Sequence, residues 1–278
     1  MAHRISKSFA ETEHGDIYVQ QADGGGAAIT LLSVTSFGSA LVGEALELLA
    51  ARGYRALAID LMGYGRSDKR YGLWPVERFA DATEQAMAAL GIAETTLVTG
   101  HFAGLTGIEL AARRSPAVRR LVLDGTPYRT PDERAALIEK GITPPVPWRE
   151  DGSHAVDHWK HFHHLAHMLN PDFALPAVPD ARYRHAYLAL LEVFAFGPST
   201  MDALTGFPIE EKLAAIGDLP VLLLTSETDW NRGTYHHFTA ALPGAARHAF
   251  PGVHPIHDLS RTGRAAEYVD VIERFVTA

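Results

Sequence analysis

The sequence predicts an α/β fold, in which a mostly parallel sheet is flanked by helices and carries an inserted helical lid. Short apolar strands alternate with helical stretches up to residue 126, the alternation breaks from 127 to 217, and it returns after 217. A single domain with one insertion suits a chain of 278 residues better than two independent domains. We therefore divide the chain into a first core part (1–126), a lid (127–217) and a second core part (218–278).

The first core part begins with a short strand at Ile17–Gln20, which a glycine turn follows. Apolar runs typical of strands buried on both faces then alternate with stretches that have the spacing of amphipathic helices. In chain order these are the strand Ala28–Leu32, the helix Ser39–Arg52, the strand Arg55–Ile59, the helix Val76–Leu90, the strand Thr95–Thr99, the helix Leu105–Arg114 and the strand Arg119–Leu123. This order indicates a parallel sheet with right-handed crossovers.

The lid is rich in proline, histidine and aromatic residues, and the prolines of Pro144–Trp148 exclude a continuous helix there. Helical spacing returns near Ala155–Leu169 and Ala181–Phe196. The second core part then resumes the strand and helix pattern. Its expected elements are a strand at Pro220–Leu224, a helix that ends at Phe238–Leu242, a strand at Arg247–Phe250 and a closing helix at Ala265–Val276.

The composition excludes several classes of protein. The formal net charge is −8, and basic residues form no cluster that would follow a phosphate backbone, so we expect no nucleic-acid partner. The absence of cysteine excludes disulfides and thiolate nucleophiles. No apolar segment has the length of a membrane span, and the N-terminus lacks the apolar region of a signal peptide. We therefore expect a cytoplasmic protein without a membrane partner.

Four motifs occur in an order that resembles the α/β-hydrolase superfamily, and together they span nearly the whole chain. They are the loop Asp60–Lys69 (DLMGYGRSDK), the segment Gly100–Gly104 (GHFAG), the strand and turn Pro220–Asp229 (PVLLLTSETD) and the late loop Phe250–His254 (FPGVH). The first is the most specific match. The second lies between a strand and a helix, where members of this superfamily carry the nucleophile elbow G-x-S-x-G. The resemblance implies the hydrolase fold, with a pocket between the sheet and the lid.

The elbow departs from the superfamily pattern, because Phe102 stands where the resemblance places a nucleophilic serine. A benzyl side chain has no hydroxyl, thiol or carboxylate, so covalent catalysis at this position is excluded. Phe102 either fills the vacated space by packing or forms one wall of a pocket for an apolar or aromatic ligand. Superfamily members usually have His-Gly after the strand Ala28–Leu32, and here the segment Ser33–Gly38 takes that place.

A histidine and an aspartate remain as candidate catalytic residues. The resemblance places the general base at His254 and the acid that orients it at Asp229. Asp124 is the alternative acid, because some superfamily members carry it after the strand that ends at Leu123. Backbone N–H groups of Thr35 and Ala103 would form the oxyanion hole, which needs no particular side chain. The opposing interpretation is an inherited dyad that is no longer used.

Further polar and aromatic residues are candidates for the pocket. His101 precedes the elbow position and is interpreted as structural, while the hydroxyls of Ser33 and Ser36 lie near the expected oxyanion site or serve as ordinary turn residues. Trp148 and Trp159 of the lid either face the substrate or pack in its core. The histidines of the lid lack the acidic residue of a His-Glu-x-x-His pattern, so we expect no metal site and no cofactor.

Two classes of function are consistent with these residues. The first is an enzyme in which the dyad acts as a general base on a small, apolar or aromatic substrate, in lyase, cyclase, isomerase or cofactor-free oxygenase chemistry or in hydrolysis by activated water. The second is a homologue that binds a ligand without catalysis. A serine hydrolase inactivated at position 102 is a third possibility. The partner in each case is a small molecule; a homodimer is compatible with the sequence, which carries no signal for it.

Overall fold

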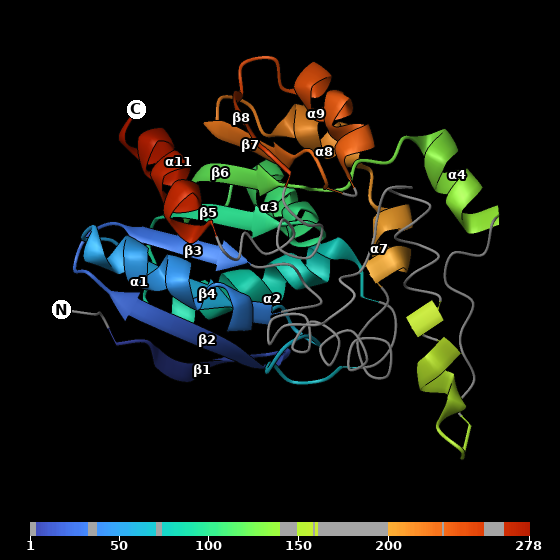
Figure 1. Ribbon diagram of the computed structural model, residues 1–278, viewed down its shortest axis with the longest axis horizontal. Coiled ribbons are helices and arrows are strands. Elements are labelled where there is room, and N and C mark those ends of the chain that lie inside the picture. The colour runs from blue at the N-terminus through green and yellow to red at the C-terminus, as the bar shows by residue number, and fades with distance from the viewer. Residues whose placement is uncertain are drawn as a thin grey trace.

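The computed structural model describes residues 4–32, 38–70, 74–139, 149–157, 159–160, 200–229, 231–252 and 264–278. Within these ranges the chain forms an eight-stranded sheet with the order β1-β2-β4-β3-β5-β6-β7-β8 (Figure 1). The strands are β1 (Ser6–Thr12), β2 (Gly15–Asp23), β3 (Ala28–Leu32), β4 (Arg55–Ile59), β5 (Thr95–Gly100), β6 (Val118–Asp124), β7 (Val221–Ser226) and β8 (Ala246–Phe250).

The sheet is parallel from β4 to β8 and antiparallel only at its first edge, where β1 and β2 form a hairpin and β2 pairs with β4. The expected α/β class with a mostly parallel sheet is therefore confirmed. The strand Ser6–Thr12 was missing from the sequence prediction. Most of its side chains are exposed at the edge of the sheet, so it lacks the apolar run that marks the buried strands.

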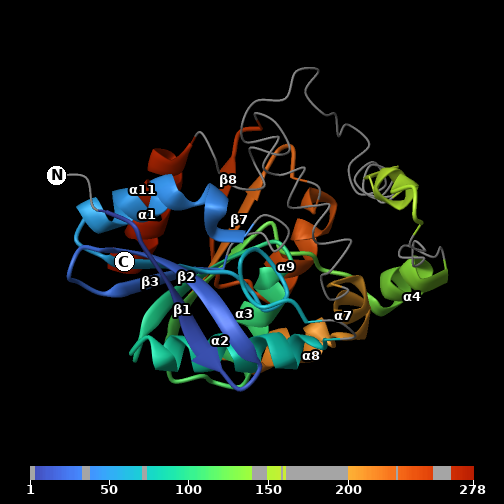
Figure 2. The same cartoon turned by 90° about the horizontal axis from the view of Figure 1, so that it is seen from below.

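Helices cover both faces of the sheet (Figure 2). The helices and short 3₁₀ turns are η1 (Gly38–Leu41), α1 (Gly43–Ala51), α2 (Val76–Ala89), α3 (Ala103–Ala112), α4 (Pro131–Glu139), α7 (Thr200–Gly206), α8 (Ile209–Ala215), η2 (Arg232–Thr234), α9 (Tyr235–Ala241) and α11 (Ala265–Thr277). On one face α1 and α11 pack around Leu46, Leu49 and Val269. On the other face α2, α3 and α8 pack around Phe79, Leu105 and Leu213. The two apolar clusters hold the sheet between them.

The boundaries of several core elements agree with the sequence to within two residues. Two details of these elements concern the site. The helix after β5 begins at Ala103 rather than Leu105, so it starts within the elbow motif. Residues Ile209–Ala215, which the sequence analysis assigned to the lid, pack against α3 through Leu213, and Lys212 forms an ion pair of 2.6 Å with Glu109. The expected helix at 181–196 lies outside the described residues, as does most of that at 155–169.

The loop after β4 is built around the buried carboxylate of Asp60. Its two oxygens accept the backbone N–H groups of Ser39 and of Arg66. Burial raises the pKa of the Asp60 carboxyl, and both backbone hydrogen bonds oppose that rise. Because Ser39 lies just beyond the segment that follows β3, Asp60 ties together the loops at the ends of two neighbouring strands.

The same loop explains the most specific motif in the sequence. Gly65 has a φ of +53°, and a Cβ atom at this position would lie 2.2 Å from Oδ2 of Asp60. The Ser67 hydroxyl donates to the Asp60 carbonyl at 2.7 Å and accepts the N–H of Tyr18 at 2.9 Å. The residues of this motif thus form hydrogen bonds with one another, and these bonds fix the conformation of the loop.

Replacement of Gly65 by alanine tests this account, with Gly91→Ala as the matched control. Both glycines have positive φ, but a Cβ at Gly91 would meet no atom within 4 Å. Alanine at either position carries the backbone penalty of about 1–2 kcal/mol. We expect Gly65→Ala to lower the free energy of unfolding in urea by at least about 1 kcal/mol more than the control, because of overpacking against Asp60. Equal losses in the two variants would contradict the steric role of this contact.

Candidate active site

The candidate site lies at the carboxyl edge of the sheet, where the parallel strands β5, β6 and β7 end next to one another. The chain runs from β3 to β4 on one side and then to β5 on the other, so the strand order reverses at β3. In open α/β sheets, ligands bind outside the carboxyl ends of the strands at such a reversal. The turn after β5, which contains the elbow motif, is therefore in the expected place for a binding or catalytic site.

The turn between β5 and α3 places its strained residue at His101. Its φ is +51°, whereas Phe102 has a helical backbone with a φ of −55°. The turn is fixed by the His101 N–H, which donates to the Asp124 carbonyl at 2.8 Å, and by the His101 carbonyl, which accepts the N–H of Gly104. A left-handed residue other than glycine is uncommon, and histidine is among the types enriched there.

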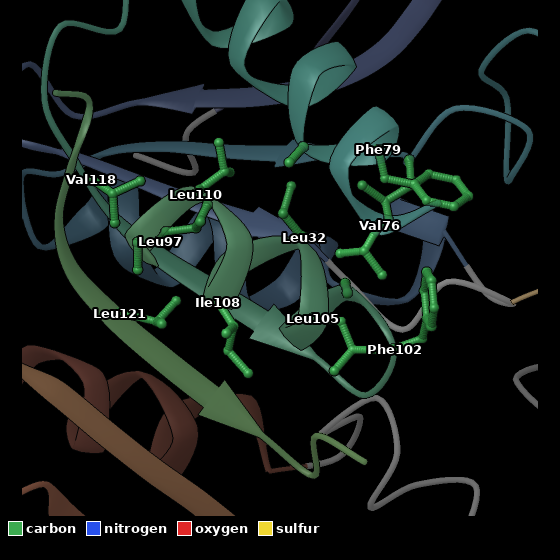
Figure 3. Packing of buried hydrophobic residues seen from close by; sticks show 14 of the residues in the cluster. Leu32, Val76, Phe79, Leu97, Phe102, Leu105, Ile108, Leu110, Val118 and Leu121 are labelled. Carbon is green, nitrogen blue, oxygen red and sulfur yellow. The ribbon is translucent and has the colours of Figure 1, made fainter. Parts of the chain in front are cut away.

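Phe102 packs into the apolar cluster on the α2 and α3 face and is 8 % exposed. Its ring meets the ring of Phe79 edge to face, with centroids 5.6 Å apart (Figure 3). Of the two interpretations of Phe102, the packing role has direct support in these contacts, and the role as a pocket wall stays a prediction.

Asp229, the first-choice acid, lies in the turn after β7, and its side chain is fully buried. One carboxylate oxygen accepts the backbone N–H of Asn231 at 2.7 Å, and the other lies 3.3 Å from Nε2 of His101. The structure thus brings the expected acid to the elbow. Among the described residues, the histidine that it meets is His101, which the sequence analysis had interpreted as structural while keeping it among the candidates for the pocket.

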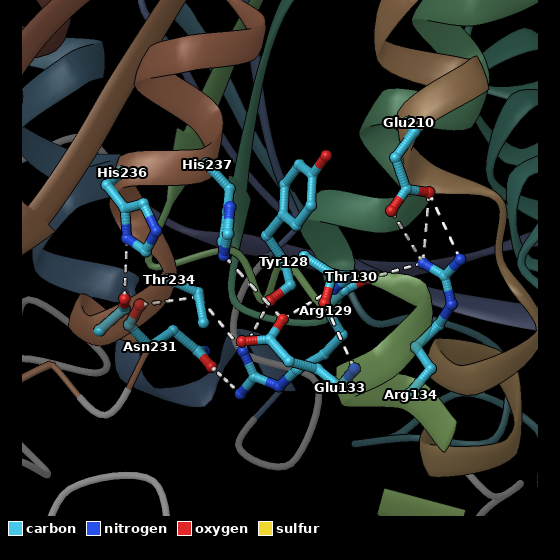
Figure 4. A network of polar contacts seen from close by, with 11 residues as sticks. Tyr128, Arg129, Thr130, Glu133, Arg134, Glu210, Asn231, Thr234, His236 and His237 are labelled. Carbon is cyan, nitrogen blue, oxygen red and sulfur yellow. Dashed lines mark hydrogen bonds and ion pairs between the residues drawn. The ribbon is translucent and has the colours of Figure 1, made fainter. Parts of the chain in front are cut away.

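Asn231 connects this pair to the loop after β6. Its side-chain Nδ2 donates to the Gly125 carbonyl at 2.8 Å and lies 3.2 Å from Nδ1 of His101. Its Oδ1 accepts a hydrogen bond of 3.1 Å from Arg129 (Figure 4). Each polar atom of the Asn231 amide therefore has a partner, and the side chain bridges two loops of the site.

Arg129 is a buried cation at this edge, with only 5 % of its surface exposed. Its other acceptors are the Tyr128 carbonyl at 2.7 Å and the Thr234 hydroxyl at 3.1 Å. Burial lowers the pKa of the Arg129 guanidinium, and the nearby charge of Glu133 opposes that change. All three acceptors are neutral, and among the described residues no carboxylate forms an ion pair with this guanidinium.

The remaining predicted site residues divide into two groups. Asp124, the alternative acid, is buried at the end of β6, and Ala103 forms the first turn of α3, while Trp159 is partly buried. The predictions that lie outside the described residues concern Ser33, Thr35, Ser36, Trp148 and His254. Within the described ranges, no three His, Asp or Glu side chains are arranged to hold a metal ion. None of the helices described has the length and apolar character that a membrane crossing requires.

Sequence reasoning missed Arg129 and Asn231. Asn231 stands two residues after the predicted acid, Asp229. Arg129 stands five residues after Asp124, the residue that ends β6. An arginine and an asparagine that follow neighbouring parallel strands lie at the same edge of the sheet, so their positions carried a signal. Neither residue belongs to the motifs that carried the resemblance, which is why they were passed over.

Comparison with known proteins places these features in a family. A family model described as the alpha/beta hydrolase fold matches residues 38–230. Over 125 residues, or 44 % of the chain, the sequence is 34 % identical to a haloalkane dehalogenase of Mycobacterium marinum, and the match spans 42 % of that protein. The chain therefore matches less than half the length of this curated relative.

Solved structures of low sequence identity share the fold over almost the entire chain. An enol-lactonase of Burkholderia xenovorans has a TM-score of 0.71 and 19 % identity, and the alignment covers 98 % of this chain and all of that one. An epoxide hydrolase of Vigna radiata has a TM-score of 0.70 and 16 % identity, with 98 % of both chains covered. Identities this low support a common fold, and fold alone does not fix function.

If Phe102 is a packing residue, truncating it leaves a cavity in the cluster with Phe79. We expect Phe102→Ala to lower the free energy of unfolding by about 3–5 kcal/mol, as measured by urea denaturation. Phe9 provides the matched control, because it is 56 % exposed on β1, and its change to alanine should cost about 1 kcal/mol or less. A loss at Phe102 no larger than that of the control would contradict the packing role.

Proposed function

Since this chain belongs to the alpha/beta hydrolase fold family, we propose that it is an enzyme in which a histidine–aspartate pair acts as a general base, without a covalent intermediate at residue 102. One observation carries the proposal. The buried carboxylate of Asp229 lies beside an elbow formed by His101, Phe102 and Ala103, which offers no hydroxyl, thiol or carboxylate. Nucleophilic catalysis needs one of those groups on the strained turn in this fold.

The base in this proposal is His254, oriented by Asp229. Among the described residues, the imidazole that contacts Asp229 is that of His101. Its Nδ1 lies next to the Asn231 amide, and its Nε2 lies next to the carboxylate. With a protein group beside each ring nitrogen, His101 is poorly suited to take a proton from a substrate. A carboxylate oxygen has two lone pairs, so Asp229 has room to accept a further N–H from a second imidazole. Asp124 remains the alternative acid.

The proposed reaction begins with proton transfer to the base. In the hydrolytic version, His254 takes a proton from water as the water oxygen attacks an electrophilic carbon, and the imidazolium then returns that proton to the leaving group. In the lyase, cyclase, isomerase or oxygenase versions, it takes a proton from the bound substrate itself. General-base assistance contributes roughly 10²- to 10⁴-fold, so the substrate must already be activated. The hydrolytic names of the relatives favour the first version, with an enol lactone as a suitable activated ester.

The second candidate is a ligand-binding protein without turnover. The packing of Phe102 against Phe79 favours it, because a core residue at the elbow fills space that a covalent mechanism would leave open. In this case Asp229 would be kept for its structural contacts alone. Screening small aromatic compounds, an enol lactone, an epoxide and a haloalkane by thermal shift tests for binding, since a ligand of the folded state raises its stability.

Replacing the proposed base and acid separates the two functions. With a substrate from that screen, we expect His254→Ala and Asp229→Asn each to lower kcat by about 100-fold or more, while ligand binding persists. Asp124→Asn should have a much smaller effect if Asp229 is the acid. His236→Ala, at an exposed histidine of α9, is the matched control. Turnover that survives the loss of His254 would rule out the general-base mechanism.

Restoring serine at the elbow tests the account of residue 102. If only the nucleophile is missing, Phe102→Ser should show a rapid burst of p-nitrophenol from a p-nitrophenyl ester, equal to about one product per protein. The expected result is no such burst, because the backbone at this position is helical and the strained residue is His101. Phe102→Ala serves as the control for the loss of packing. A stoichiometric burst from the serine variant alone would instead support a serine hydrolase inactivated at position 102.

A further inference from the structure

The geometry points to Asn231 and Arg129 as positioning residues that determine which ring nitrogen of His101 carries its proton. Asn231 contacts both members of the His101–Asp229 pair, and Arg129 contacts Asn231. All four residues are buried, with exposures of 2 to 7 %. The inference concerns the state of the imidazole beside the acid; only its catalytic consequence rests on the proposed function.

The first step is the orientation of the Asn231 amide. The Gly125 carbonyl, 2.8 Å away, can only accept a hydrogen bond, so it requires the NH₂ group. The guanidinium of Arg129 can only donate, so it requires the amide oxygen, at 3.1 Å. Reversing the amide would set oxygen against oxygen and N–H against N–H. Two neighbours on the loop after β6 therefore fix the same orientation independently.

The second step transfers this orientation to His101. The Asn231 NH₂ group is a donor, and it lies 3.2 Å from Nδ1 of His101, so Nδ1 must accept and carries no proton. The neutral imidazole then holds its proton on Nε2, which lies 3.3 Å from Oδ2 of Asp229. The backbone N–H of Asn231 donates to the other oxygen of Asp229 at 2.7 Å. One residue thus sets both the tautomer of His101 and the orientation of the carboxylate.

The third step concerns the charges around this chain of donors. The guanidinium of Arg129 lies at one end and the carboxylate of Asp229 at the other, with the Asn231 amide and the His101 ring between them. Glu133 contributes a negative charge near Arg129, and His237 lies 4.0 Å from that carboxylate. The backbone carbonyl of Asp124 accepts the backbone N–H of His101 and so leaves both ring nitrogens to other partners. The buried charges of Arg129 and Asp229 are opposite in sign and are connected through the neutral side chains of Asn231 and His101. Each charge therefore compensates the other.

Nitrogen NMR of the imidazoles tests the inference on the unmodified protein. In protein labelled with ¹⁵N at histidine, the ring signals of His101 are assigned by their loss in His101→Gln. We expect Nδ1 to have the chemical shift of an unprotonated nitrogen and Nε2 that of a protonated one. The reverse pattern, or a protonated Nδ1 at neutral pH, would overturn the inference. The measurement needs no substrate, so its result is separate from that of the proposed function.

Substitutions at Asn231 and Thr234 distinguish control of the His101 tautomer from a general disturbance of the site. Asn231→Asp exchanges the donor that faces Nδ1 for an acceptor, so we expect a proton on Nδ1 in this variant. Thr234→Val removes another side-chain acceptor of Arg129 but keeps the Asn231 amide, and it should leave the wild-type shifts unchanged. A wild-type pattern in Asn231→Asp, or a protonated Nδ1 in Thr234→Val, would show that Asn231 does not set the tautomer.

Discussion

The arrangement of the site depends on the burial of one carboxylate, that of Asp229, at the carboxyl edge of the sheet. An isolated buried charge is costly, so such a group needs hydrogen bonds and an opposite charge nearby. Asp229 receives an N–H from Asn231 and faces His101, and the Asn231 side chain continues the contacts to the buried cation Arg129. The three loops after β5, β6 and β7 therefore hold one another in place through this set of polar contacts.

Two glycines allow the loops of the site to approach one another closely. A Cβ at Gly125, which has a φ of +57°, would lie 2.3 Å from Oδ2 of Asp229 and 2.9 Å from Nε2 of His101. A Cβ at Gly104 would lie 2.0 Å from the Thr126 hydroxyl, so the first turn of α3 packs directly on the loop after β6. The second glycine of the elbow motif is thus required for packing in a chain that has no serine between the two glycines.

The sequence was sufficient for the class of fold, because strands buried on both faces are continuous apolar runs and their order with helices restricts the topology. It was insufficient for β1, whose exposed side chains at the sheet edge give no such run. The place of Asp229 at the end of β7 could be predicted, since a motif marks it. Its contact with His101 and the link to Arg129 could not, because they depend on how three loops from distant parts of the chain pack together.

The contacts of Asp229 affect how strongly the presence of this aspartate supports a catalytic role. Because His101, Asn231 and Arg129 already stabilise the buried carboxylate, the fold has a structural reason to keep it even in a protein without turnover. The same contacts are compatible with a second imidazole beside Asp229, because each oxygen of a carboxylate has two lone pairs. The structural role of Asp229 and its proposed catalytic role are therefore compatible, and the enzymatic proposal depends on the imidazole of His254.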